Sequence, residues 1–206
     1  YLHVPDMVAE GWAQFHRDLR REMTLEALVV DVRGNRGGHT SELIIERLIR
    51  KVIAWDLPRG LNPITYPEDA PRGPLVAVAD HNAGSDGDIV TAAFQVYKLG
   101  PVVGTRTWGG VIGTEGDHRL VDGTHITVPR YSFWFDGLGW GVENYGVDPD
   151  VEVDITPQDW AQGRDPQIEE AVRLALAALE ERPAATPPDP ATRPSRRRPV
   201  LPPRPS

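Results

Sequence analysis

The segment Asp31-Val-Arg-Gly-Asn-Arg-Gly-Gly38 begins at the end of a nearly unbroken apolar run from Leu25 to Val32. An apolar run of this kind is typical of a strand buried on both faces of a parallel sheet. The glycines then predict a tight turn. Thr40 or Ser41 can cap the helix that follows, whose apolar residues continue to Ile53. The stretch therefore predicts a strand, a turn and a helix in succession.

The rest of the chain repeats this alternation of strands and helices. We expect strands over residues 2–4, 75–79 and 102–105, and helices over residues 6–22, 85–98 and 166–181. A proline-rich loop covers about residues 56–73, and residues 111–155 shift to short strands separated by glycine turns, including residues 125–128 and 151–155. The order predicts an α/β fold with a central sheet flanked by helices, over residues 1–182.

Length and composition fit one globular domain with a tail. The chain has 206 residues, of which 40% are hydrophobic and 25% charged, values ordinary for soluble proteins. No apolar run approaches the ~20 residues that span a bilayer, so we expect no membrane insertion. The absence of cysteine excludes disulfides and thiolate sites and agrees with a reducing cytoplasm. The N-terminus lacks both an initiator Met and a signal-peptide layout, and we interpret the chain as a fragment of a longer polypeptide.

Charge divides the chain into an acidic body and a basic tail. Residues 183–206 contain five Arg, one Asp and nine Pro, and the remaining residues carry 17 basic against 29 acidic side chains. An acidic body argues against nonspecific nucleic-acid binding, which needs basic side chains to neutralise phosphates. Because the tail offers little apolar surface to bury, we expect it to be disordered. Its Arg196-Arg-Arg198 run is interpreted as part of a solvated terminus.

Ser85 is the first candidate functional residue. It stands in a turn of small residues, Ala83-Gly-Ser-Asp-Gly87, between an apolar strand and a helix. At a helix N-terminus the free N–H groups and the helix dipole favour the negative charge of a developing alkoxide or oxyanion. Serine is also a preferred helix cap. The turn alone therefore fits both a cap and a nucleophile.

The glycine pair Gly37-Gly38 favours the nucleophile. It lies at the preceding strand-to-helix junction, and paired glycines expose N–H groups that can complete an oxyanion hole beside a nucleophile from the next junction. A phosphate-binding turn is the alternative, but no Lys follows the glycines and the P-loop spacing is missing.

The Asp-x-Arg-Gly-Asn-x-Gly-Gly pattern of residues 31–38 resembles the signature of the tail-specific, or C-terminal-processing, serine peptidases and their tricorn relatives. In that superfamily the nucleophile follows on the next strand-to-helix turn, where Ser85 stands. Residues 104–110 resemble the family's Thr-Phe-Gly-Lys-Gly segment, whose lysine is the general base of tail-specific enzymes. Here that position is Gly110, and Lys98 lies on the same helix as Ser85 without matching the motif.

The missing lysine indicates the tricorn branch, in which a histidine activates the serine and a glutamate completes the relay. Tricorn-like segments occur at residues 1–7, 84–87, 104–110 and 143–146, and the resemblance covers about residues 1–182. In the tricorn layout the histidine and a supporting serine precede a peptide-binding module, so both would lie upstream of Tyr1. The resemblance implies a Clp-protease/crotonase-like fold of repeated ββα units, and a cytoplasmic hydrolase of short peptides that assembles as a hexamer.

The resemblance also assigns individual site residues. It makes Ser85 the nucleophile and gives the oxyanion hole to the N–H groups of Gly38 and Asp86. Glu143 matches the glutamate that helps to orient the site, although by itself it reads as an exposed loop acid. Asp56 occupies the spacing of the acid that selects basic side chains beside the scissile bond, and it equally fits an ordinary loop residue ahead of Pro58.

Several alternatives remain open from the sequence. His81 and His39 are near the two turns, but neither matches the family's histidine, so a Ser85–His81 enzyme is the weakest alternative. A crotonase-like acyl-CoA enzyme would share the fold and oxyanion hole, and a noncatalytic peptide-binding or assembly domain would keep the groove without a base. No His-x-x-x-His pattern is present, and we expect neither a metal nor another cofactor.

Overall fold

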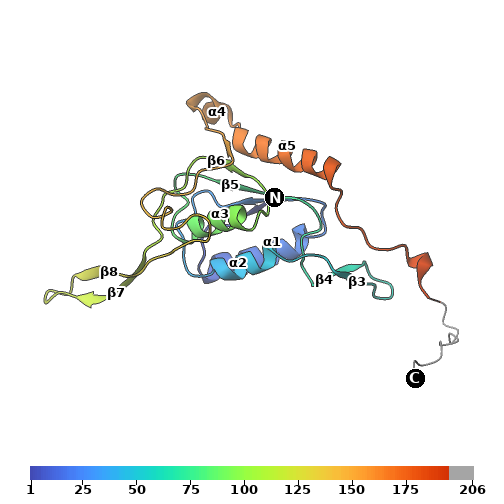
Figure 1. Cartoon of the computed structure of the whole chain (residues 1–206), viewed down its shortest axis with the longest axis horizontal. Coiled ribbons are helices and arrows are strands. Elements are labelled where there is room, and N and C mark those ends of the chain that lie inside the picture. Colours follow the sequence, from blue (N-terminus) through green and yellow to red (C-terminus); the bar gives the residue numbers. More distant parts are fainter. Residues whose placement is uncertain (195–206) are drawn as a thin grey trace, which may run out of the picture.

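A parallel sheet forms the centre of the chain (Figure 1). The computed structural model describes residues 1–194, except for the side chains of residues 115 and 117. The sheet has five strands in the order β1-β2-β5-β6-β9, and its members are β1 (Leu2–His3), β2 (Leu28–Asp31), β5 (Leu75–Ala79), β6 (Val102–Gly104) and β9 (Val151–Glu152). All four pairings between neighbours are parallel.

Helices cover both faces of this sheet, and the predicted α/β fold with a flanked central sheet is confirmed. Three helices pack on one face: α1 (Ala9–Glu22), α2 (Ser41–Leu48) and α3 (Asp86–Val96). The long helix α5 (Pro166–Glu181) packs on the other face, with the short α4 (Pro157–Gln162) before it (Figure 1). A single turn of 3-10 helix spans Pro190–Thr192.

The alternation of side chains along β5 explains the two cores. All five residues of β5 are buried. Leu75, Ala77 and Ala79 belong to the core beneath α1, α2 and α3, whereas Val76 and Val78 pack with Ala171 and Ala175 of α5. Successive side chains of a strand point to opposite faces, so an unbroken apolar run is what a strand covered on both sides needs.

Two hairpins project from opposite ends of the molecule (Figure 1). One joins β7 (Gly113–Arg119) to β8 (His125–Tyr131), in the region where short strands are expected. The other joins β3 (Ala54–Asp56) to β4 (Ile64–Tyr66), so that a strand ends at the start of the predicted loop of residues 56–73 and another lies inside it. The prediction of a loop is wrong there, and so is the extension of the preceding helix to Ile53. The Ile53 N–H donates to the Tyr66 carbonyl at 2.9 Å, so the helix ends at Leu48 and the chain enters the hairpin.

The segment after α5 begins on the body of the molecule. Ala184 is buried, and the Ala185 N–H donates to the Arg72 carbonyl at 2.7 Å while the Arg72 Nε donates back to the Ala185 carbonyl at 2.9 Å. The expected boundary at residue 182 therefore falls just before a packed contact. The Arg196–Arg198 run and the rest of the expected tail beyond residue 194 lie outside the described residues. Within residues 1–194, no helix has the length and apolarity needed to cross a membrane.

Candidate active site

Ser85 occupies a strained position between β5 and α3. It is the N-cap of α3, and its backbone has φ 55° and ψ −118°, in the half of conformational space that side chains disfavour. Strain of this kind costs ~1–3 kcal/mol and persists only where the surroundings impose it. A serine on a sharp, strained strand-to-helix turn has its hydroxyl raised above the turn, an arrangement suited to nucleophiles.

Gly37 lies directly against Ser85. A Cβ placed on Gly37 would lie 2.5 Å from the Ser85 Cβ and 2.9 Å from the Asp86 nitrogen. The next N–H along the chain, that of Gly38, and the N–H of Asp86 both lack an acceptor among residues 1–194. The Asp86 carboxylate faces elsewhere and accepts the Ser41 N–H at 3.0 Å, which ties the starts of α2 and α3 together.

Asn35 joins the glycine turn to the serine turn. It is fully buried, its Nδ2 donates to the Val4 carbonyl, and its Oδ1 accepts the Gly37 N–H, both at 2.8 Å. The Asn35 carbonyl accepts the Gly84 N–H at 2.8 Å. One side chain thus fixes the glycines, while its own backbone holds the residue before Ser85.

The Asp and Arg of the same motif form a network away from Ser85. The buried Asp31 carboxylate pairs with the Arg33 Nη2 at 2.7 Å and accepts the Tyr1 hydroxyl at 2.7 Å. Burial, followed by this hydrogen bond, raises the Tyr1 pKa to about 12. Arg33 also pairs with Asp165 at the start of α5, at 2.8 Å. The network therefore fastens the end of β2 to α5 and serves the scaffold.

Two carboxylates hold the loop that follows Trp108. Asp88, in the first turn of α3, accepts the Gly109 N–H at 2.8 Å and the Gly110 N–H at 3.0 Å. The half-buried Glu143 accepts the next two N–H groups with its Oε2, from Val111 at 2.7 Å and Ile112 at 2.9 Å. By its sequence context alone Glu143 fits an exposed loop acid, whereas in the structure it is half-buried and bound to this loop.

Trp108 covers the serine turn from one side. A Cβ on Gly84 would meet the Trp108 ring at 2.6 Å, and the backbone N–H of Trp108 donates to the Ala83 carbonyl at 2.9 Å. Trp108 nevertheless remains 68% exposed. A large apolar surface is therefore open to solvent immediately beside Ser85.

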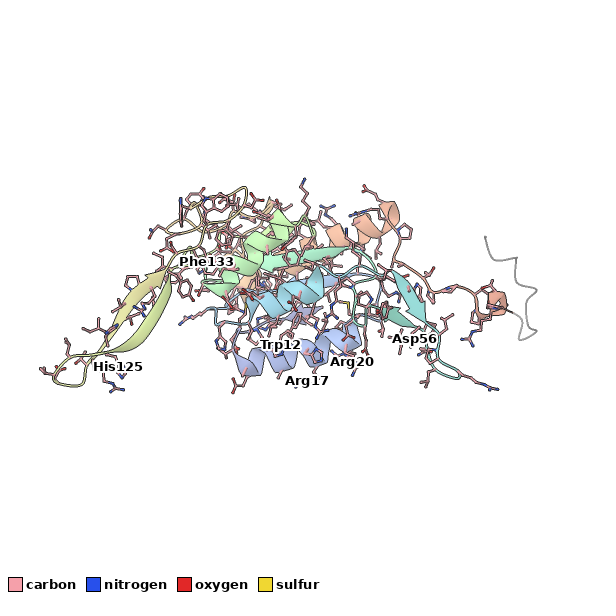
Figure 2. All side chains as sticks on the ribbon, turned by 60° about the horizontal axis from the view of Figure 1, so that its bottom comes forward. Trp12, Arg17, Arg20, Asp56, His125 and Phe133 are labelled. Atoms are coloured by element: carbon pink, nitrogen blue, oxygen red, sulfur yellow. The ribbon has the colours of Figure 1, made fainter. Side chains whose placement is uncertain are left out.

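Asp56 is not brought to Ser85 within this chain. It ends the exposed strand β3, in the hairpin at one end of the molecule, opposite the end that carries His125 and Phe133 (Figure 2). Ser85, Asp86 and Gly38 are grouped, and Glu143 reaches the adjoining loop, so four of the five candidate residues cluster and Asp56 stands apart.

No histidine in residues 1–194 forms a hydrogen bond with Ser85. His39 is exposed, and the His81 ring lies 3.2 Å from the Asn82 amide nitrogen. His81 lines a cleft of about 810 Å³ that also borders Tyr1, Arg33 and Trp160 but not Ser85. Over the same described part of the chain, no group of three His, Cys, Asp or Glu side chains is arranged to hold a metal.

The comparison with known families agrees with this arrangement. The model of peptidase family S41 matches residues 1–153, which include both turns, the Trp108 loop and Glu143. The chain belongs to peptidase family S41. The predicted relationship is confirmed, and at the level of the S41 family the chain is a peptidase domain.

Curated S41 relatives are named as tricorn proteases. Tricorn protease homolog 1 of Streptomyces coelicolor is 68% identical over 188 residues, covering 91% of this chain and 18% of that protein. The tricorn protease of Thermoplasma acidophilum is 47% identical over 179 residues, covering 87% of this chain and 17% of that protein. A crystal structure of the tricorn protease matches with a TM-score of 0.82 at 48% identity, over 88% of this chain and 17% of the other. The chain therefore spans less than a fifth of the length of these S41 relatives.

The sequence gives little sign of the residues that assemble the candidate site from a distance. Asn35 is visible there only as part of a motif, and nothing in that motif points to Asp88. The spacing of Ser85 and Asp88 is that of a capping box, a signal that could have drawn attention to Asp88. No comparable local signal links Asp88 to Gly109 and Gly110, which lie 21 and 22 residues further along the chain.

Proposed function

We propose that this chain is the nucleophile-bearing domain of a tricorn-type serine peptidase, and that Ser85 attacks the peptide carbonyl. The observation that carries the proposal is the strained Ser85 turn, packed against Gly37, with the free N–H groups of Gly38 and Asp86 nearby. Family membership supports peptidase chemistry, and the turn supports serine as the nucleophile.

The reaction would proceed through an acyl-enzyme. The Ser85 oxygen adds to the carbonyl carbon, and the N–H groups of Gly38 and Asp86 stabilise the resulting oxyanion. Collapse releases the amine product and leaves the acyl group on Ser85, and water then hydrolyses the ester. A general base must take the serine proton, and its contribution is typically ~10²–10⁴-fold. We assign this role to a histidine from a part of the polypeptide outside these 206 residues, so this chain alone should be a very poor peptidase.

The proposal also assigns roles to Glu143 and Asp56, and it includes the substrates and the assembly. Glu143 would help to orient the site through the loop that it binds, and Asp56 would select a basic residue next to the scissile bond from within a neighbouring subunit. The substrates would be short peptides and the assembly a cytoplasmic hexamer that also contains the upstream domains of the same polypeptide. The much greater length of the S41 relatives supports further domains in the same polypeptide, and the exposed position of Asp56 leaves it free to contact another subunit.

The test is labelling by a fluorophosphonate probe, together with peptide turnover, in the full-length parent protein. Wild type should be labelled at Ser85. Ser85→Ala should lose the label and orders of magnitude in turnover while its melting temperature stays above the assay temperature. Ser132→Ala, which removes an exposed serine, is the matched control and should behave as wild type. Peptide turnover near that of wild type in Ser85→Ala would end the proposal. Binding of peptides without labelling would favour a noncatalytic binding domain.

A further inference from the structure

Asp88 is a fully buried carboxylate that accepts three backbone hydrogen bonds. Its Oδ2 accepts the Ser85 N–H at 2.9 Å and the Gly110 N–H at 3.0 Å, and its Oδ1 accepts the Gly109 N–H at 2.8 Å. A buried carboxylate is costly unless such bonds satisfy it, and bonds to an ionised acceptor are about twice as strong as neutral ones.

Only one of these three bonds belongs to ordinary helix capping. A carboxylate at the third helical position commonly accepts the N–H of the capping residue. The same arrangement occurs in α4, where Asp159 accepts the Thr156 N–H at 3.2 Å, but there the other carboxylate oxygen pairs with Arg164 at the surface. The bonds from Asp88 to Gly109 and Gly110 are therefore additional to capping.

The loop that Asp88 binds is also held by backbone bonds, from the Trp108 N–H to the Ala83 carbonyl at 2.9 Å and from the Asn144 N–H to the Gly109 carbonyl at 2.7 Å. Its two glycines carry no side chains, and Gly109 has φ +84° with its Cα packed on the Tyr145–Gly146 backbone. The next two N–H groups are bound by Glu143, so four successive amides, residues 109–112, are held by two carboxylates. One of these carboxylates stands on the nucleophile's own helix.

We infer that Asp88 is a positioning residue that fixes Ser85 relative to the loop of residues 108–112. The inference rests on the proposed function of Ser85. The Asp88 carboxylate binds both the Ser85 N–H and the loop that carries Trp108. It therefore fixes the distance between Ser85 and the apolar surface of Trp108. An error of about 1 Å in such a spacing can cost ~100-fold in rate.

The test compares Asp88→Asn with Asp159→Asn in the full-length protein. An Asn side chain keeps the shape of Asp but has only one acceptor oxygen, so it cannot serve both Gly109 and the Ser85–Gly110 pair. The second-order rate constant of fluorophosphonate labelling and its final stoichiometry are measured separately. We expect Asp88→Asn to lower the rate constant about tenfold to a hundredfold at full stoichiometry. Asp159→Asn should stay within about twofold of wild type, because it perturbs only the capping box of α4 and the ion pair with Arg164, neither of which contacts Ser85. A purely structural role would lower the stoichiometry, as fewer molecules fold, and leave the rate constant of the labelled fraction unchanged.

Hydrogen exchange supplies a readout independent of chemistry and of the proposed function. Peptides covering residues 83–90 and 106–113 should both exchange faster in Asp88→Asn, and neither should change in Asp159→Asn. Asp88→Glu is the second variant, because it keeps the charge and the capping spacing while shifting the carboxylate by one methylene. It should slow labelling as well. Unchanged exchange at residues 106–113, or wild-type labelling in both Asp88 variants, would overturn the inference. Failure of wild type to label, with exchange changed as expected, would instead count against the nucleophile.

Discussion

Gly37 and Ser85 approach so closely that a side chain has no room between them: a Cβ on Gly37 would lie 2.9 Å from the Ser85 Oγ and 2.5 Å from its Cβ. Real Cβ atoms essentially never lie that close to another atom, so the two turns can pack in this way only because residue 37 has no side chain. The glycine is required by this contact and also by its φ of +91°. The position of the proposed nucleophile thus depends on a residue 48 positions earlier in the chain.

Gly37→Ala should therefore disable Ser85, because the new methyl group would displace the Ser85 side chain or the whole turn. Gly34→Ala is the matched control, since Gly34 also has positive φ (+72°) but open space around its Cβ. In both variants the free energy of unfolding should fall by ~1–2 kcal/mol, because alanine disfavours a backbone with positive φ. Only Gly37→Ala should also lose fluorophosphonate labelling, by at least about tenfold. Equal labelling of the two variants would contradict the steric argument.

Ser85→Gly should be more stable than Ser85→Ala, because glycine adopts φ 55°, ψ −118° without strain whereas alanine keeps the Cβ that causes it. The relief of strain is partly cancelled by the larger backbone entropy of glycine in the unfolded chain. We therefore expect the free energy of unfolding of Ser85→Gly to exceed that of Ser85→Ala by roughly 1 kcal/mol. Chemical denaturation of the two inactive variants measures this difference directly. A less stable glycine variant would show that the turn is not strained.

Glu143→Gln should weaken the hold on the Val111 and Ile112 amides, because a neutral oxygen accepts hydrogen bonds less strongly than a carboxylate. We expect turnover of the full-length enzyme to fall at least about tenfold. Glu152→Gln, at an exposed position in β9, should leave turnover unchanged. Turnover equal to wild type in Glu143→Gln would remove Glu143 from the proposed site.

Asp56→Asn should abolish a preference for Arg over Leu before the scissile bond in the full-length protein. A charge-assisted contact contributes ~1.5–3 kcal/mol, so the ratio of kcat/KM values for two matched peptides should fall roughly ten- to a hundredfold. Asp122→Asn, at the turn between β7 and β8, is the control for removing an exposed acid. If the ratio is the same in all three proteins, Asp56 is an ordinary residue of its hairpin.

Truncation after Arg182 should destabilise the chain, because it removes the buried Ala184 and both hydrogen bonds between Arg72 and Ala185, one from the Ala185 N–H and one from the Arg72 side chain. The loss of ~1–2 kcal/mol corresponds to a drop of roughly 2–8 °C in melting temperature for a domain of this size. Truncation after Pro194 retains these contacts and should leave the melting temperature within about 1 °C of the intact chain. Equal melting temperatures of the two truncated chains would mean that the Ala184 contact contributes nothing.

The elements that could be predicted are those with strong local signals. Strand β5 and helix α5 are found at the predicted residues, because β5 is an unbroken apolar run and α5 begins at Asp165-Pro166, a cap followed by a proline. The β3–β4 hairpin was missed because each strand has only three residues and mostly exposed side chains, so no alternation marks it.

The candidate site likewise contains some residues that local sequence patterns predict and others that they do not. The two turns that carry Gly38 and Ser85 are visible as motifs, because glycines and a serine stand at two successive strand-to-helix junctions and together match a family pattern. The side chains of Asn35 and Asp88 instead bind backbone groups that are distant in the chain, the Val4 carbonyl and the Gly109 N–H respectively. Such contacts depend on how the sheet and helices assemble, and a single sequence carries no pattern for them.

The positive φ of Ser85 has a consequence for the history of the molecule. A serine there makes the fold less stable than glycine would, so folding alone gives no reason to keep it. Where a lineage no longer needs the reaction, drift should replace this serine with glycine, the residue that tolerates such a backbone best. Inactive descendants should then be recognisable at this one position, with the glycine turn and its buried asparagine still intact.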